Sequence, residues 1–271
     1  MPMWSGPLIE YTGRWLRHAD MMARCEAAQM GLVDEKTLSA RASERRWNYM
    51  GDSVSGPPEY ARNYDRVELV ADGIVHVIGV SLGLIGAVAI IVVTANSEHA
   101  ADTGLIIIYS IGLLSMLGFS AAYNTWPISR MKWLLRRFDH SAIYVMIAGT
   151  YTPFVAQMKN DLVSASLLIG VWLTAAIGVA LKLLLPGRYD NLAIVLYLLL
   201  GWSGVVIYPS IVKALPGLSI WLLAAGGVLY TLGVVFHMWE RLRFQNVIWH
   251  VFVLVAACCH YSAVTILYVR A

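Results

Sequence analysis

The chain has 271 residues, of which 58% are hydrophobic and only 14% are charged. Soluble domains are about 25% charged, so this composition argues against a soluble globular enzyme. The first 72 residues hold 9 basic and 11 acidic residues, which leaves 11 basic and 6 acidic residues for the remaining 199. We therefore expect an aqueous N-terminal segment followed by a membrane domain. A formal net charge of +3 is too small and too scattered to indicate nucleic-acid binding.

Residues 1–66 are predicted to form a cytoplasmic extension that is partly helical or flexible. Several arginines stand among apolar residues there, so an alternative is that the segment lies on the anionic inner leaflet. Gly51–Pro58, with the sequence GDSVSGPP, is typical of a flexible linker. The predicted domains are therefore the extension at 1–66 and a membrane domain at 67–271.

From Gly73 onward the chain contains seven mainly apolar windows of the length that spans a bilayer, about 20 residues. The windows are Gly73–Thr94, Thr103–Asn124, His140–Met158, Leu162–Leu185, Leu192–Val212, Leu218–Trp239 and Val247–Val269. Short breaks rich in turn-forming and charged residues separate them, which favours antiparallel neighbours. The predicted fold is an all-α integral membrane bundle of seven transmembrane helices.

Basic residues in the short loops predict the orientation, because cytoplasmic loops carry an excess of lysine and arginine. With the N-terminus in the cytoplasm, eight basic residues fall in inner loops and two in outer loops. The inner residues are Arg130, Lys132, Arg136, Arg137, Lys182, Arg188, Arg241 and Arg243, and the outer ones are Lys159 and Lys213. We therefore expect a cytoplasmic N-terminus and a location in a bacterial inner membrane.

Polar residues near the inner ends of the spans are the candidate functional residues, because ionisable groups inside a membrane are costly. Glu68, Asp72 and His76 are spaced i, i+4, i+8 and so share one face of the first helix. Three other segments bring polar residues to the same depth. These residues are Asn124 at the end of the second span, Asp139 and His140 at the start of the third, and Asn246 and His250 at the start of the seventh. Four segments are thus predicted to converge on one site.

Structural roles are the alternative explanation for the same residues. Glu68 and Asp139 stand near helix starts, where the helix dipole or capping favours an acidic side chain. His76 and His250 lie deeper in apolar sequence, where an interhelical hydrogen bond would satisfy them without any chemistry. The sequence leaves both interpretations open.

Several stretches of the membrane domain, from about Glu68 to Tyr268, resemble the hemolysin III / progestin and adipoQ receptor family. They are ADGIVHVIG at Ala71–Gly79, SAAYN at Ser120–Asn124, FDHSAIYVMIAGTYTPF at Phe138–Phe154, LYTLGVVFHMWERL at Leu229–Leu242 and NVIWHVFVLVAACCH at Asn246–His260. The resemblance implies seven helices with a cytoplasmic N-terminus. Members of the family are similar to intramembrane zinc hydrolases of the ceramidase-like superfamily, in which three histidines hold zinc near the inner face.

Carried over by position, the zinc ligands implied by the resemblance fall at Asn124, Asn246 and His250. The resemblance assigns the acid that orients a zinc-bound water to Asp139, and the serine of the family motif falls at Ser120. Two of the three expected histidines are therefore asparagine, whose neutral amide oxygen is a poor donor for zinc.

A further departure is Asp72, which stands where the family usually carries asparagine. Either the zinc site is lost, or it has moved and is built from Asp72, His76, Asp139 and His250. Of these two interpretations we favour loss.

The sequence is compatible with three functions. The first is a metal-assisted hydrolase of a membrane lipid, at an amide bond, with Asp139 as general base or orienting group. The second is a non-catalytic protein that binds or senses a lipid. The third, a pore or proton-linked transporter, has weak support because the polar residues gather at one end of the spans. Membrane lipids are the expected partners.

Overall fold

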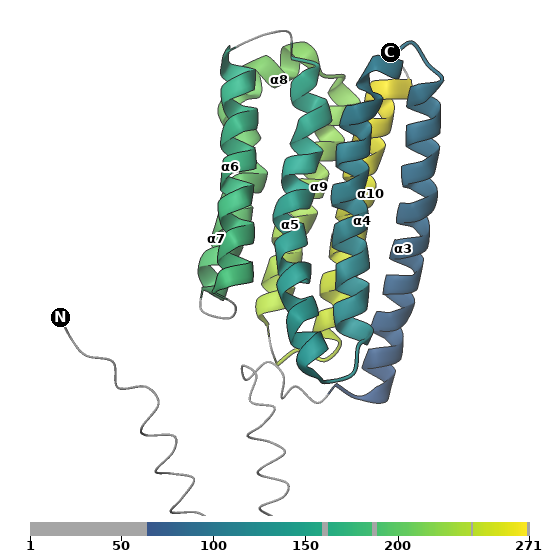
Figure 1. The fold of residues 1–271 in the computed structure, drawn as a ribbon, viewed down its shortest axis with the longest axis vertical. Helices are drawn as coiled ribbons and strands as arrows, with labels where there is room; N and C mark the ends of the chain where they lie inside the picture. Colours follow the sequence, from purple (N-terminus) through teal and green to yellow (C-terminus); the bar gives the residue numbers. More distant parts are fainter. Residues whose placement is uncertain (1–63, 159–161, 186–188, 240, 270–271) are drawn as a thin grey trace, which may run out of the picture. The chain divides into compact units, whose positions relative to one another are not determined.

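The computed structural model describes residues 64–158, 162–185, 189–239 and 241–269. These residues form helices and short connections, and no strand occurs among them. The helices, labelled as in Figure 1, are α3 Arg66–Ala95, α4 Thr103–Thr125, α5 Arg130–Ala156, α6 Leu162–Leu184, α7 Asp190–Trp202, α8 Tyr208–Ala214, α9 Gly217–Met238 and α10 Gln245–Val269. The extension predicted at 1–66 lies almost wholly outside the described residues.

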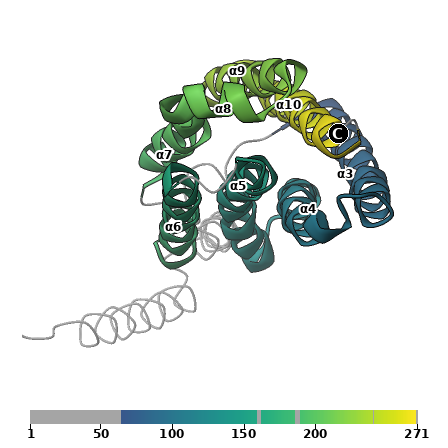
Figure 2. The same cartoon turned by 90° about the horizontal axis from the view of Figure 1, so that it is seen from above.

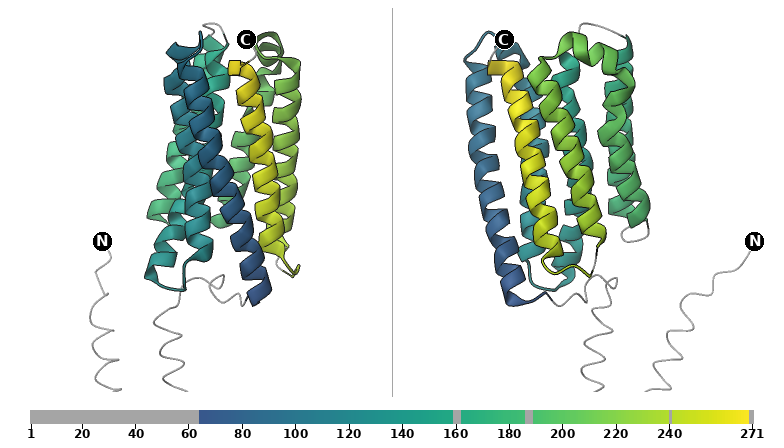
Figure 3. Two further views of the ribbon diagram at one scale, coloured as in Figure 1. Left: turned by 90° about the vertical axis from the view of Figure 1, so that its right-hand side faces the viewer. Right: turned by 180° about the vertical axis from the view of Figure 1, so that it is seen from behind.

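The long helices of the membrane domain stand side by side and form a ring. Seen from above in Figure 2, α3, α4, α5 and α6 make one side of this ring, and α7, α8, α9 and α10 make the other. Helices that follow one another in the chain pack together, and α10 closes the ring by packing against both α9 and α3. Figure 3 shows this position of α10 between α3 and α9. The closure brings the first and last helices of the domain into contact.

Six helical stretches within the described residues are long and apolar enough to cross a membrane. They are Arg66–Ala95, Ala100–Thr125, Leu162–Leu184, Asp190–Ala214, Gly217–Met238 and Gln245–Tyr268. The third predicted span falls within α5, which runs beside the others in Figure 1. Helix α5 is not among the six because it is less apolar along its whole length. Its first turns hold Arg130, Lys132 and Arg136, and the rest contains Asp139, His140 and several threonines and tyrosines. The prediction of a helical membrane bundle is confirmed, with six rather than seven helices that qualify as spans by length and apolarity.

The start of α3 lies before the predicted window at Gly73. The Asp65 carboxylate accepts the Glu68 N–H at 2.8 Å, and Glu68 accepts the Asp65 N–H at 3.0 Å, which is a capping box. The hydrogen bond from the Glu68 backbone holds the pKa of the Asp65 carboxyl below its usual value. Because the helix begins at Arg66, Asp72 and His76 both lie within regular helix.

The predicted fifth span is not one continuous helix. Helix α7 ends at Trp202, a 3-10 turn follows at Ser203–Ile207, and α8 begins at Tyr208. Pro209 has no N–H to donate, so the α-helical ladder cannot continue unchanged through this region. The hydroxyl of Tyr151 on α5 accepts the Gly204 N–H at 2.7 Å and donates to the Gly201 carbonyl at 3.0 Å. The tyrosine thereby satisfies backbone groups that the break leaves unpaired.

The outer surface of the bundle is apolar, as a lipid environment requires. On α3, Val77 and Ile85 are each 68% exposed, whereas Ala87 and Ile90 on the same helix are buried. The interior is closely packed around aromatic residues such as Tyr109, which is fully buried. Exposing apolar side chains of this size and number to water would be energetically unfavourable, so their presence agrees with membrane insertion.

Helices α4 and α5 approach each other closely at Gly112. A Cβ atom at this position would lie 3.1 Å from the Cα of Met146 and 3.1 Å from the carbonyl oxygen of Val145. Small residues let membrane helices pack backbone to backbone, since lipid provides no hydrophobic force between them. Gly112 therefore sets the distance between the helix that carries Ser120 and the helix that carries Asp139.

Replacing Gly112 with valine should push α4 and α5 apart and lower the stability by about 1–3 kcal/mol, as overpacking does. Thermal unfolding in detergent, followed by circular dichroism, measures the change. Gly118→Val on the same helix is the matched control, because a Cβ there would meet nothing within 4 Å. An equal loss of stability in the two variants would contradict this account of the contact.

Candidate active site

The sequence-predicted site residues all line one cavity of about 570 Å³. The cavity lies at the end of the bundle where α3, α5 and α10 begin and α4 ends. The predicted residues on its wall are Glu68, Asp72, His76, Ser120, Asn124, Asp139, His140, Asn246 and His250. Much of the remaining wall is apolar and includes Leu117, Ile194 and Leu254. The cavity thus combines the predicted polar side chains, which come from four helices, with apolar lining residues.

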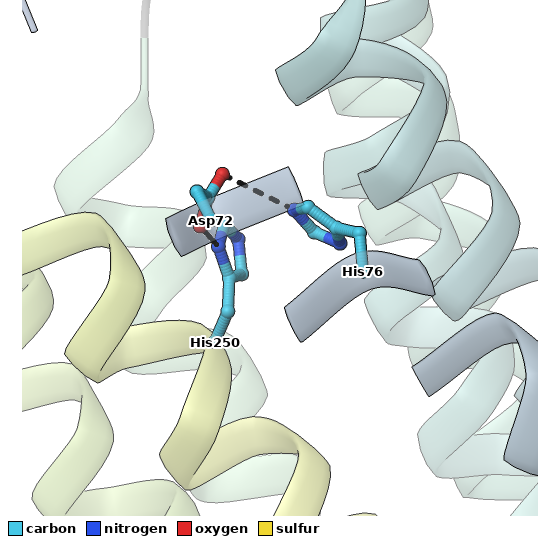
Figure 4. Close-up of side chains that lie close together, drawn as sticks. All are labelled: Asp72, His76 and His250. Carbon is cyan, nitrogen blue, oxygen red and sulfur yellow. Dashed lines mark hydrogen bonds and ion pairs between the residues drawn. The ribbon is translucent and has the colours of Figure 1, made fainter. Parts of the chain in front are cut away.

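The Asp72 carboxylate is the centre of the polar cluster (Figure 4). Its Oδ1 lies 2.6 Å from Nδ1 of His250, and its Oδ2 lies 3.3 Å from Nε2 of His76. Oδ2 also accepts a hydrogen bond from Nδ2 of Asn246 at 3.1 Å. Asp72, His76 and His250 are each at most 7% exposed. One turn of α3 separates Asp72 from His76, and one turn of α10 separates Asn246 from His250, so two helix faces meet at this carboxylate.

The side chains of Asn124 and Asn246 are hydrogen-bonded to each other. Nδ2 of Asn246 donates to Oδ1 of Asn124 at 3.0 Å, and Nδ2 of Asn124 donates to the backbone carbonyl of Ser120 at 2.9 Å. At two of the three positions where the resemblance implies zinc ligands, the side chains are therefore amides held in a hydrogen-bonded chain. His250 is the one imidazole of that set. These residues do not fit a zinc ion at the family position.

Asp72, His76 and His250 form a group of a kind that can hold a metal ion. Their ligand atoms all lie within 4.8 Å of one another. The sequence suggested a relocated metal site of four residues, and these are three of the four. The fourth, Asp139, does not belong to this group. Two ligand atoms of one tetrahedral zinc are roughly 3.3 Å apart, given zinc–ligand bonds of about 2.0–2.1 Å. The 2.6 Å between His250 Nδ1 and Asp72 Oδ1 is instead a hydrogen-bond distance.

Ser120 lies on the other side of the His250 ring from Asp72. Its Oγ is 3.4 Å from Nε2 of His250, and the side chain is only partly buried on the cavity wall. The Asp139 carboxyl, in the third turn of α5, faces the Ser120 hydroxyl. His250 therefore uses both ring nitrogens, one toward a carboxylate and one toward a hydroxyl.

Glu68 has a role that its sequence position alone did not reveal. Its Oε1 accepts the backbone N–H of Phe244 at 2.8 Å, just before α10 begins. Phe244 has a positive φ of 58°, an uncommon conformation for a residue other than glycine. Glu68 thus fastens the turn that leads into Asn246 and His250, while its other oxygen caps α3.

A buried charged network lies on the same cavity wall. The sequence did not predict it, because its basic residues were assigned only to the positively charged inner loops. Asp190 at the start of α7 accepts a hydrogen bond from Nη2 of Arg136 at 2.8 Å and a second from Nζ of Lys182. Arg136 and Lys182 are 3% and 5% exposed. The signal available in the sequence was an acidic residue eight positions after Lys182, across a turn. The network ties α5, α6 and α7 together.

Asp190→Asn should lower the stability by about 3 kcal/mol or more, because it leaves two buried cations without their counter-charge. Thermal unfolding in detergent provides the measurement. Arg243→Gln is the comparison, since it breaks a pair with Asp65 in which the side chains are 69% and 46% exposed. Ion pairs between exposed side chains contribute little to the free energy of unfolding. Similar melting temperatures for the two variants would contradict a structural role for the buried network.

The purified protein should hold less than one zinc per chain even when zinc is plentiful, because two ligand positions are amides. Restoring imidazoles with Asn124→His and Asn246→His together should raise the bound zinc toward one per chain. Elemental analysis of detergent-purified protein gives both values. Stoichiometric zinc in the unaltered chain, lost in both Asp72→Asn and His250→Ala, would instead establish a relocated site.

Comparisons with known proteins show the family to which the chain belongs. A family model described as "Haemolysin-III related" matches residues 67–261. The chain is 35% identical over 187 residues to a hemolysin-3 homolog of Bacillus subtilis (strain 168), covering 69% of this chain and 88% of that protein. It is 32% identical over 187 residues to hemolysin-3 of Bacillus cereus, covering 69% and 85%.

A human protein is also similar. The chain is 31% identical over 163 residues to the monocyte to macrophage differentiation factor of Homo sapiens, covering 58% of this chain and 67% of that protein. The family match extends from the first turn of α3 into α10 and so includes every residue of the candidate site. The chain is a multi-pass membrane protein and belongs to the haemolysin-III family.

Proposed function

We propose that this protein is an intramembrane hydrolase that cleaves the acyl bond of a membrane lipid, an amide or an ester. One observation carries the proposal: a hydroxyl, two imidazoles and two carboxylates from α3, α4, α5 and α10 line a single cavity whose wall also contains many apolar side chains. This combination suits the hydrolysis of an acyl lipid, because the acyl chain needs an apolar surface and the scissile carbonyl needs polar groups.

The proposed orientation places the cavity at the cytoplasmic leaflet of a bacterial inner membrane. All seven long helical stretches, α5 included, would cross the membrane, with the N-terminus in the cytoplasm. The excess of basic residues at the cavity end supports this orientation. Buried polar groups at that depth are reachable both by water from the cytoplasm and by lipid from the leaflet.

Asp139 and Ser120 are the residues that we propose act on the substrate. The Asp139 carboxyl faces the Ser120 hydroxyl, and both line the cavity. We assign to Asp139 the orientation of the hydrolytic water, as the family resemblance implies. The ordered network around Asp72 would hold this part of the cavity in place.

Purified protein in liposomes should release free fatty acid from fluorescent N-acyl or O-acyl lipids. Both Ser120→Ala and Asp139→Asn should lower the rate at least about 100-fold, because each removes a group that acts in proton transfer or positioning. Mass spectrometry of the released fatty acid provides the measurement. Ser110→Ala is the matched control, since Ser110 is buried on the same helix and does not line the cavity.

Two outcomes would contradict the proposal in different ways. Tight copurification of a lipid without any fatty acid release would favour a lipid-binding protein. Leakage of a small dye from liposomes that contain the protein, again without hydrolysis, would favour a pore.

A further inference from the structure

We propose that Ser120, His250 and Asp72 form a nucleophile, base and orienting triad, so that the protein cleaves acyl bonds through an acyl-serine without a metal ion. The inference deepens the proposed hydrolase function and rests on it for the class of substrate. Its basis is the order of contacts around one imidazole ring. The three residues come from α4, α10 and α3, and all of them line the cavity.

His250 is held as the base of such a triad must be held. Nδ1 lies 2.6 Å from Oδ1 of Asp72, so the Nδ1–H is donated to the carboxylate and the lone pair is left on Nε2. Nε2 lies 3.4 Å from Oγ of Ser120. This second distance exceeds the roughly 2.6–3.2 Å of an assembled nucleophile–base pair, as is common in sites without substrate. The ring thus presents its basic nitrogen to the Ser120 hydroxyl.

The supporting contacts fix the carboxylate and leave the hydroxyl accessible. Asn246 donates to Oδ2 of Asp72 at 3.1 Å, which prevents the carboxylate from rotating away from His250. The ring of His76 packs against that of His250, with centroids 4.4 Å apart. Asp72 and His250 are nearly fully buried, whereas Ser120 is only partly buried on the cavity wall. A buried, oriented base beside a partly exposed nucleophile is the arrangement that covalent catalysis requires.

The side chains of Asn124 and Asn246 are consistent with this chemistry. Because neither is an imidazole, no metal set competes at that position for Nε2 of His250. Their amides instead bond to each other, to Asp72 and to the backbone of Ser120. They act as positioning residues, linking the helix end that carries the nucleophile to the carboxylate that orients the base.

The reaction uses this triad, the acyl lipid and water, with Asp139 orienting the water as proposed above. Oγ of Ser120 forms a bond to the acyl carbon, and its proton passes to Nε2 of His250. The carbon–oxygen or carbon–nitrogen bond to the leaving group then breaks, and His250 returns the proton to the leaving alcohol or amine. Water next attacks the acyl-serine and gives a proton to Nε2. The fatty acid leaves as the bond to Oγ breaks, and the proton returns to Ser120.

Labelling with a fluorophosphonate probe tests the triad independently of the natural substrate. Such a probe forms a bond between phosphorus and an activated serine Oγ with loss of fluoride. In the full chain in detergent, peptide mapping should find the adduct on Ser120, and chelators should not slow its formation. Ser120→Ala should abolish the label at this position, whereas Ser110→Ala should label like the unaltered protein.

Asp72→Asn tests the positioning residue, because it keeps the side-chain shape and removes the charge. The labelling rate should fall on the order of 10³–10⁴-fold, as expected when the orienting carboxylate of a triad is lost. The rate is measured well below the melting temperature of the variant, so that only folded protein is compared. A purely structural role for Asp72 would change the melting temperature and leave the labelling rate of the folded protein unchanged.

The outcomes separate this inference from the proposed function. Labelling of Ser120 without hydrolysis of any acyl lipid supports the triad and rejects the lipid hydrolase. Absence of label on Ser120 in the folded protein overturns the triad, as does an unchanged labelling rate in Asp72→Asn. Lipid hydrolysis that chelators abolish, with no label on Ser120, overturns the triad and retains the hydrolase with a metal.

Discussion

The burial of one carboxylate, that of Asp72, determines how this end of the bundle is built. A charged group removed from water is tolerated only when its oxygens are hydrogen-bonded or paired. Asp72 is 6% exposed, and its partners come from its own helix and from α10, which begins 173 positions later in the chain. Since α10 must bring His250 and Asn246 to this point, the carboxylate fixes the register between the first and last helices of the domain.

The other polar contacts at this end follow from that constraint. Glu68, one turn before Asp72, bonds to the backbone of Phe244 and so sets where α10 starts. Asn246 carries the network across to Asn124 on α4, and the tight packing at Gly112 places the start of α5 beside it. The Arg136, Lys182 and Asp190 network then extends the polar wall to α6 and α7. These contacts together connect α3, α4, α5, α6, α7 and α10 around the cavity.

These contacts also explain why the zinc positions implied by the family resemblance can carry asparagine without collapse of the site. Loss of two imidazoles would leave unsatisfied polar groups if nothing replaced their bonds. The amide of Asn246 donates hydrogen bonds both to Asn124 and to the Asp72 carboxylate. That carboxylate, which the family pattern lacks, also pairs with His250. The three departures from the family pattern are therefore mutually consistent and form one hydrogen-bonded unit.

The sequence by itself determined the helices, the apolar outer face and the set of polar residues, because these depend on local composition and on the 3.6-residue period. The i, i+4 spacing of Asp72 with His76, and of Asn246 with His250, already placed each pair on one helix face. Tertiary structure alone decided which atoms meet, because the ring closure of α10 onto α3 sets distances that no local pattern encodes. The same limit applies to the break between α7 and α8, which depends on Tyr151 of another helix. It applies equally to His250, whose two nitrogens face residues 178 and 130 positions away.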